Sequence, residues 1–312
     1  MTDRRVPDFF IVGNPKCGTT ALYEMLRRQP GIFMPNKKSP HFFASENGAA
    51  PARLPQTVED YLALFDDARP GQLLGEASPS YLRSLTAASL IAEMQPDARI
   101  IAILREPASF LRSLHLQMVQ NHLETVKDFE KAIRLEPARR LGERIPRNCR
   151  LPQALLYSEH VRYVEQLRRY HAVFRPENVL VLIYDDFRAD NEGTVSAVLE
   201  FLGVESVAPV QAREANPTVR LRSKWLDDWI HRVSVSRGPV MKGVRLGIKA
   251  VTSRRLRHRA LGMRGSVVYG EPRAPDEQLM LELRGRFKGE VEALSDYLGR
   301  DLVDLWDYGS VD

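Results

Sequence analysis

The segment FFIVGNPKCGTT, residues 9–20, places four apolar residues before a turn that contains two glycines and ends in two threonines. Phe9–Val12 is a run typical of a short buried strand, and Thr19–Arg28 has the spacing of apolar residues expected of a helix. Backbone N–H groups converge at the start of such a helix, and the helix dipole favours negative charge there. The segment therefore predicts a strand, a phosphate-binding turn and a helix, in that order.

The turn differs from the phosphate loop of nucleotide kinases and GTPases. Gly13 and Gly18 have the spacing of the G-x-x-x-x-G-K-[ST] loop, but Thr19 stands at its lysine position. Lys16 comes three residues earlier and should project from the middle of the turn, toward a group beyond the first phosphate. An ordinary strand–turn–helix connection with a chance lysine is the alternative. The residues predicted to surround the anion are Pro15, Lys16, Cys17, Gly18, Thr19 and Thr20.

A second basic residue follows another buried strand. The apolar run Arg99–Leu104 predicts the strand, and Arg105 comes directly after it. P-loop kinases and GTPases usually need an aspartate at such a strand end to hold Mg²⁺. An arginine there suits a second phosphate, and Ser113 adds a hydroxyl donor; a structural ion pair is the alternative for Arg105. Two anion sites without a metal-binding aspartate indicate a nucleotide with phosphates at both ends of its ribose.

Strand-like and helix-like segments alternate along the rest of the chain. Further strands are predicted at Leu73–Gly75 and Val179–Tyr184. Helices are predicted at Ala87–Met94, Pro107–Gln120, Gln153–Tyr170, Thr194–Leu202 and Asp276–Leu298. Apolar strands separated by helices predict an α/β fold with a parallel sheet covered on both faces, and ligands bind beyond the carboxyl ends of such strands.

Three segments interrupt this alternation. Ser45–Gln56 and Glu136–Pro152 are rich in Pro, Arg and Gly, and they are predicted to be loops or lids over the site. Gly238–Pro275 is the best candidate for a mobile insertion. No composition shift marks a domain boundary, so residues 1–312 are predicted to form a single domain.

Composition limits the class of protein. Hydrophobic residues make up 44% and charged residues 27% of the 312, which is typical of a globular chain. No apolar stretch approaches the roughly 20 residues of a membrane span. Cys17 and Cys149 are the two cysteines, too few for a disulfide framework or a four-cysteine zinc site. We therefore expect a reducing, cytoplasmic location.

Positive charge is concentrated in one stretch. The net charge is +5, and the stretch Arg220–Arg264 holds 13 Lys or Arg residues against two acidic ones. A solvated basic face is one reading; an anionic cofactor, an acidic acceptor or a membrane surface are the others. The chain has no nucleic-acid-binding motif, so a nucleic-acid partner is not expected.

The motifs together resemble those of sulfotransferases that use 3′-phosphoadenylyl sulfate (PAPS). PKCGTT at 15–20 is similar to the family's 5′-phosphosulfate loop, and LREPASFLRS at 104–113 to its 3′-phosphate motif. The bacterial and heparan-sulfate-type branch is similar at KSPHFF (38–43), GEASPSYL (75–82), 216–223 and 287–306. The resemblance runs from Phe9 to Trp306 and implies a three-layer α/β fold of the P-loop type.

The resemblance also implies roles in sulfuryl transfer. Lys16 would stabilise the charge that develops on the bridging oxygen, and Cys17 would be a small packing residue. The 5′-phosphate would be held by Thr19 and Thr20, and the 3′-phosphate by Arg105 and Ser113. Arg220 and Arg222 would close over the 3′-phosphate, with surface arginines as the alternative. The scheme requires no metal.

The proton acceptor cannot be carried over from the family. Heparan-sulfate-type relatives have a glutamate directly before the P-H-F-F element, where this chain has Ser39. His41, Glu76 and His115 remain as candidates, and His41 is the prediction because it is nearest to the missing carboxylate and histidine titrates near neutrality. Packing of His41 among aromatic residues is its alternative role. Holding a lysine or a histidine in place is the alternative role of Glu76.

Two other functional classes compete with the sulfotransferase. A P-loop kinase would need ATP and Mg²⁺, and a non-catalytic nucleotide-binding relative would have lost its activity along with the missing glutamate. The expected acceptor is a hydroxyl, phenolic if the lost carboxylate reflects an acidic acceptor. Heavy use of Arg, Ala and Pro suggests a GC-rich bacterial genome, in which such enzymes modify secondary metabolites, lipids or glycans. The oligomeric state is left open.

Overall fold

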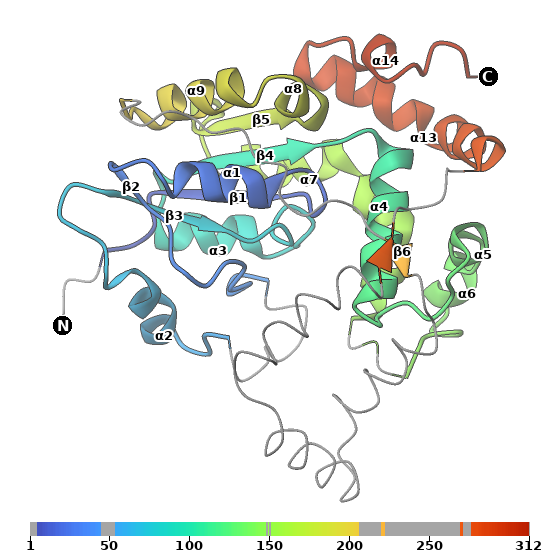
Figure 1. Cartoon of the computed structure of the whole chain (residues 1–312), viewed down its shortest axis with the longest axis horizontal. Coiled ribbons are helices and arrows are strands. Elements are labelled where there is room, and N and C mark those ends of the chain that lie inside the picture. Colours follow the sequence, from blue (N-terminus) through green and yellow to red (C-terminus); the bar gives the residue numbers. More distant parts are fainter. Residues whose placement is uncertain are drawn as a thin grey trace, which may run out of the picture.

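A parallel sheet of five strands forms the centre of the structure (Figure 1). The computed structural model describes residues 5–44, 54–147, 149, 151–205, 220–221, 269–270 and 276–311. In sheet order the strands are β2 (Ile32–Phe33), β3 (Leu73–Ala77), β1 (Phe9–Gly13), β4 (Arg99–Leu104) and β5 (Val179–Ile183). A separate antiparallel pair joins β6 (Arg220–Leu221) to β7 (Tyr269–Gly270). The predicted parallel sheet is confirmed.

Helices cover both faces of this sheet (Figure 1). On one face α1 (Thr19–Leu26) contacts α9 (Asn191–Leu202); on the other, α3 (Ala87–Met94) contacts α7 (Tyr163–His171). The long helix α13 (Glu277–Leu298) packs against α7 and α4 (Pro107–Gln120). Shorter helices are α2 (Val58–Leu62), α5 (Phe129–Arg134), α6 (Glu136–Arg140), α8 (Tyr184–Ala189), α14 (Leu302–Leu305) and the 3-10 turns η2 (Ala63–Phe65), η3 (Pro152–Leu155), η4 (Tyr157–Val161) and η5 (Pro176–Asn178).

The strand order reverses between the paired strands β1 and β4, the position at which open α/β sheets form a ligand crevice. From β1 the chain moves through α1 to β2 and β3 on one side, whereas from β4 it moves to β5 on the other. Ligands in open α/β sheets bind at such a reversal, beyond the carboxyl ends of the strands. The turn after β1 and Arg105 after β4 both lie at this edge.

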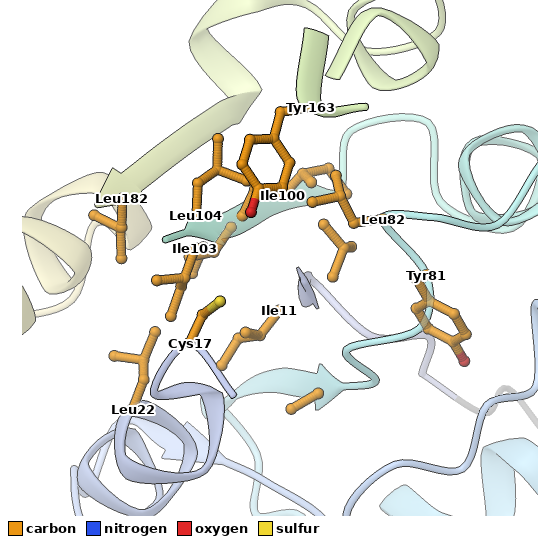
Figure 2. Packing of buried hydrophobic residues seen from close by; sticks show 14 of the residues in the cluster. Ile11, Cys17, Leu22, Tyr81, Leu82, Ile100, Ile103, Leu104, Tyr163 and Leu182 are labelled. Atoms are coloured by element: carbon orange, nitrogen blue, oxygen red, sulfur yellow. The ribbon is translucent and has the colours of Figure 1, made fainter. Parts of the chain in front are cut away.

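The two central strands form the middle of the hydrophobic core. Every residue of β1 is buried, and in β4 the residues Ile100–Leu104 have no solvent exposure. Figure 2 shows the Cys17 side chain packed into this cluster beside Ile11 and Ile103. Burying an aliphatic side chain of this size contributes about 1.5–3 kcal/mol, so the strands that carry the site are anchored by packing.

Local sequence signals fix several helix ends. At α4, the Glu106 side chain accepts from Ala108 N and Ser109 N, and Pro107 occupies the first turn. Helices α9 and α13 end at Gly203 and Gly299, whose positive φ angles close the last turns. The predicted bounds of α3 and α4 are confirmed, and the start of α4 is explained by this cap.

One predicted helix is wrong. Gln153–Tyr170 is divided into η3, η4 and the shorter α7, which begins at Tyr163. Side chains compete for the helical carbonyls: His160 bonds Ala154 O at 2.9 Å, and Gln166 Nε2 donates to Glu159 O at 2.9 Å. The apolar spacing that suggested one continuous helix reflects burial of all three pieces.

Other predicted boundaries change less. Glu136–Arg140 is helix α6 and not part of a loop, because Pro137 suits the first turn of a helix. Tyr184 starts α8 instead of ending a strand. Residues 45–53 lie outside the described residues. So does the candidate insertion at 238–275, apart from 269–270. None of the described helices is both long enough and apolar enough to span a bilayer.

Candidate active site

The turn after β1 has the backbone of an anion site. Lys16 and Gly18 both have positive φ angles, and Gly18 caps α1, whose first turn contains no acidic residue. A Cβ at Gly18 would lie 2.8 Å from the Phe187 ring, so glycine is required there for space as well as for φ. No carboxylate within the first turn of α1 therefore competes with an anion for the N–H groups at the start of the helix.

Cys17 is a packing residue of this turn. It is fully buried, and burial raises the pKa of its thiol to about 12. A thiol with so high a pKa is not ionised at neutral pH, which agrees with a packing role and not with a nucleophilic one. Thr19 is also buried, whereas Thr20 is half-buried at the surface of α1.

Two cations meet at the crevice. The Arg105 guanidinium donates from Nη1 to Lys16 O at 3.1 Å and lies 4.7 Å from the centre of the Tyr184 ring. Tyr163 OH donates to Arg105 O at 2.9 Å and fixes the end of β4. Burial, followed by the charge of Arg105, lowers the pKa of Lys16. Within the described part of the chain neither cation pairs with a carboxylate, so the site favours an anion.

The turn also contains a buried amide. Asn14 has no solvent exposure, and its N–H donates to Ile103 O at 2.8 Å. Neither Oδ1 nor Nδ2 of its side chain has a hydrogen-bond partner among the residues described. A buried amide without a hydrogen-bond partner destabilises the folded state, and a polar ligand in the turn would provide the missing partner.

The remaining residues predicted to bind phosphate are Ser113, Arg220 and Arg222, and the structure describes them to different extents. Ser113 is buried on α4, about two helical turns beyond Arg105. Arg112 beside it is a further cation, and burial followed by the Arg105 charge lowers its pKa. Arg220 is described only as backbone, in β6, and Arg222 lies outside the described residues.

The segment 38–43 lies along the carboxyl end of β3. Ser39 N donates to Ala77 O at 3.0 Å, and His41 N donates to Ser78 Oγ at 3.0 Å. Both Ser39 and His41 have positive φ angles. This irregular backbone brings the segment to the same sheet edge as the phosphate-binding turn.

His41 is held by one side of its ring. Nδ1 shares a hydrogen bond of 2.6 Å with Ser80 Oγ, and no described residue engages Nε2. Burial, helped by the Lys38 charge, lowers the pKa of His41 to about 4. The ring is therefore neutral over the physiological pH range.

Glu76 is the carboxylate of this region. It is fully buried at the end of β3; Tyr61 OH donates to Oε2 at 3.2 Å, and Oε1 has no partner among the residues described. Burial raises its pKa to about 7. Burial lowers the pKa of Lys38 to about 8, against the opposing effect of Glu76. The two groups thus titrate close to neutrality.

An aromatic layer covers these ionisable groups. The Phe42 and Tyr61 rings stack with centroids 4.6 Å apart, and the Phe43 ring meets both edge-on at 5.2 Å. Tyr81 is fully buried beside Phe43. The layer explains the desolvation that moves the pKa values of Glu76 and Lys38.

His115 has a packing environment. It is buried, with Nδ1 bonded to Tyr157 OH at 2.8 Å and Nε2 to Lys127 O at 3.3 Å. Tyr157 OH in turn lies 3.3 Å from Glu124, which pairs with the buried Arg139 at 2.7 Å. Both ring nitrogens are engaged, so His115 is the weakest of the three candidates for a proton acceptor.

The two parts of the site touch through Leu82. Leu82 N donates to Val12 O at 2.7 Å, and a Cβ at Gly13 would lie 2.4 Å from Leu82 Cβ. The segment that follows β3 therefore rests directly on the phosphate-binding turn. Glycine at 13 is needed for this close approach.

Sequence reasoning missed several of these residues. Tyr184 ends the predicted strand next to that of Arg105, so the adjacency of strand ends was a usable signal for it. Asn14, Tyr61 and Ser80 gave no signal beyond their positions inside or beside motifs. Over the ranges that the structure describes, no group of three His, Cys, Asp or Glu side chains is arranged to hold a metal ion.

Comparison with known proteins identifies relatives. The model of the sulfotransferase domain family matches residues 6–224. Carbohydrate sulfotransferase 15 from Mus musculus is 27% identical over 264 residues, which covers 67% of this chain and 46% of that protein. Human heparan sulfate glucosamine 3-O-sulfotransferase 6 is 36% identical over 110 residues, 34% of this chain and 29% of that one. The chain thus spans less than half the length of these relatives.

A solved structure shares the fold over nearly the whole chain. The crystal structure of a sulfotransferase from Alicyclobacillus acidocaldarius covers 97% of this chain and 99% of its own, with a TM-score of 0.67 and 24% identity. That similarity confirms the predicted three-layer α/β architecture.

Proposed function

Since the chain belongs to the sulfotransferase domain family, we propose that it transfers the sulfuryl group of PAPS to an acceptor hydroxyl. One observation carries the proposal: Lys16 and Arg105 meet at the β1–β4 crevice with no carboxylate paired to either among the described residues. Such a pair of cations suits a ligand with phosphates at two separate positions.

The residues present fit PAPS. The N-terminus of α1 and the unpartnered amide of Asn14 offer polar contacts to the 5′-phosphosulfate, and Thr19 and Thr20 add hydroxyls. Arg105 and Ser113 are assigned to the 3′-phosphate, and Arg220 and Arg222 to closure over it. When bound, PAPS supplies a sulfuryl group attached to a phosphate leaving group.

Lys16 is assigned to the leaving-group side. It lies in the middle of the turn, where its backbone oxygen is fixed by Arg105. A cation held in advance beside the oxygen that gains charge stabilises the transition state more than the ground state. The partial burial that lowers the pKa of Lys16 also strengthens its electrostatic effect, because water screens it less.

His41 is assigned to accept the proton of the hydroxyl. Ser80 orients its ring, and Nε2 is not engaged by any described residue. With a pKa of about 4 the ring needs no prior deprotonation, but it is a weak base. A weak base suits an acidic hydroxyl such as a phenol, whose pKa is about 10. Glu76 is assigned to stabilise the charge of Lys38, whose pKa it raises against the effect of burial.

The acceptor is proposed to be a secondary metabolite, lipid or glycan. The names of two relatives refer to carbohydrate and heparan sulfate glucosamine, which supports a glycan. Phe42 is the one ring of the aromatic layer that is partly exposed, which supports an acceptor with a ring that can pack against it. Contact of the basic stretch 220–264 with an anionic acceptor or a membrane surface, and a cytoplasmic location, complete the proposal.

Two measurements test it. We expect 3′,5′-bisphosphoadenosine to raise the melting temperature of the purified chain, and ATP with Mg²⁺ to have little effect. We also expect transfer of labelled sulfate from PAPS to a panel of phenolic and glycan acceptors, undiminished in EDTA. Stabilisation by ATP–Mg²⁺ alone would favour the kinase, and bisphosphate binding without transfer to any acceptor would favour the non-catalytic relative.

A further inference from the structure

The C-terminal segment reaches back to the ends of β4 and β5. Tyr308 is fully buried, and its hydroxyl donates to Glu106 Oε1 at 2.7 Å. Trp306, also buried, donates from Nε1 to Asp185 Oδ2 at 3.0 Å. We call Trp306 and Tyr308 the C-terminal clasp. Figure 1 shows α13 and α14, which lead into it, beside α8 at this end of the sheet.

The two acidic partners are neighbours of the anion site in sequence. Glu106 directly follows Arg105, and Asp185 directly follows Tyr184. Arg105 and Tyr184 themselves form the cation–π contact at 4.7 Å. The clasp therefore bonds the residue that follows Arg105 and the residue that follows Tyr184. The clasp residues lie about 120–200 residues further along the chain than these partners.

The hydrogen bonds of the clasp also control where two negative charges lie. Glu106 and Asp185 are carboxylates close to a site that should bind an anion, and the charge of Asp185 is felt at Cys17 in the turn. A carboxylate that turned toward Arg105 would neutralise it and repel a phosphate. Glu106 is instead bonded to Ala108 N, Ser109 N and Tyr308 OH, and Asp185 to Trp306.

We propose that Trp306 and Tyr308 are positioning residues for the 3′-phosphate. They hold Asp185 and Glu106 in fixed hydrogen bonds, so that Arg105 stays stacked on Tyr184 and unpaired with acid, available to the phosphate. This inference rests on the proposed function, because it concerns the same PAPS site.

The test compares two nucleotides on two conservative variants. Tyr308→Phe and Trp306→Phe each remove one donor and keep an aromatic ring. We expect each to weaken binding of 3′,5′-bisphosphoadenosine by about three- to tenfold, the scale of one hydrogen bond. Binding of adenosine 5′-phosphate, which lacks the 3′-phosphate, should change less than about twofold, because the clasp acts only on Arg105. Calorimetry on the full chain gives both affinities.

A matched control removes a hydroxyl from α13, the helix that precedes the clasp in the chain. Tyr297 on α13 shares its hydrogen bond with His171, away from Arg105, so Tyr297→Phe should leave both affinities unchanged. Equal weakening of both nucleotides would mark the clasp as merely structural and overturn the inference. Bisphosphate binding within twofold of wild type in either folded variant would also overturn it; if Tyr308→Phe does not fold, Trp306→Phe decides. If the wild-type chain binds no bisphosphate, the proposed function itself fails.

Discussion

The two halves of the site are built from different kinds of group. The donor half, residues 13–20 with Arg105, consists of backbone N–H groups and cations at the ends of β1 and β4. The acceptor half, residues 38–43 with Glu76–Leu82, contains groups whose pKa values burial has moved, to about 4 for His41, about 7 for Glu76 and about 8 for Lys38.

This difference separates binding from proton transfer. Arginine and backbone amides keep their charge or dipole at any ordinary pH, so these groups of the donor half should add no pH dependence of their own to phosphate binding. The acceptor half depends on desolvation by the aromatic layer, and small changes in burial should change its protonation. Substitutions in the first half should therefore alter binding and charge stabilisation, and those in the second should alter the dependence on pH.

The largest effect should come from Lys16. We expect Lys16→Ala to lower kcat by about 10²-fold or more, the scale of losing one preorganised donor, while the fold survives. Rates with saturating PAPS and circular dichroism measure this, with the exposed Lys131→Ala as the control. Near-normal turnover in Lys16→Ala would remove this lysine from the mechanism.

His41→Phe should have the next largest effect, lowering kcat by about 10²-fold. A base must be unprotonated, so activity is lost as pH falls through its pKa. With a pKa of about 4 for His41, the wild-type rate should not fall between pH 8 and pH 5. A fall with a midpoint near pH 7 that disappears in Glu76→Gln, with His41→Phe still active, would transfer the role to Glu76.

Arg105→Ala should act on binding. Loss of a charged hydrogen bond costs about 1.5–3 kcal/mol, so the affinity for 3′,5′-bisphosphoadenosine should fall by about 10- to 100-fold. The affinity for adenosine 5′-phosphosulfate, which lacks the 3′-phosphate, should change much less. The exposed Arg175→Ala serves as the matched control. Equal losses for both ligands would place Arg105 elsewhere than at the 3′-phosphate.

The smallest effect should be on stability, from Glu76→Gln. Burial raises the pKa of Glu76 in the folded state to about 7, above its unfolded value, so its contribution to stability is present at low pH and lost as pH rises toward 7. The variant should therefore gain stability relative to wild type between pH 5 and pH 8, by on the order of 2 kcal/mol. Urea unfolding at pH 5 and at pH 8 gives the free energy of unfolding of both proteins. If the variant and the wild type differ by the same amount at the two pH values, Glu76 does not titrate between them.

The donor half was predictable because its information is local. Strand β4 and helix α4 follow from a continuous apolar run and from Pro107, and the turn follows from glycines whose spacing fixes the backbone. The predicted helix 153–170 failed because buried side chains such as His160 and Gln166 take carbonyls that a continuous helix would use.

The acceptor half was less predictable for a related reason. Its residues could be named from the motif, but their protonation is set by contacts from elsewhere in the chain. Tyr61 reaches Glu76 from α2, and Ser80 reaches His41 from beyond β3. A motif gives the residue types, whereas the desolvation that tunes them exists only after folding.

The contact between Gly13 and Leu82 has a consequence for redesign. Because a Cβ at position 13 would lie 2.4 Å from Leu82 Cβ, the two positions form a compensating pair. Alanine at 13 should be accepted only when residue 82 has no Cβ, as in a Gly13→Ala, Leu82→Gly double substitution. Libraries that randomise the 78–82 segment to change acceptor preference should therefore keep Leu82 constant or vary it together with Gly13, since a larger side chain at 82 would push directly on the donor turn.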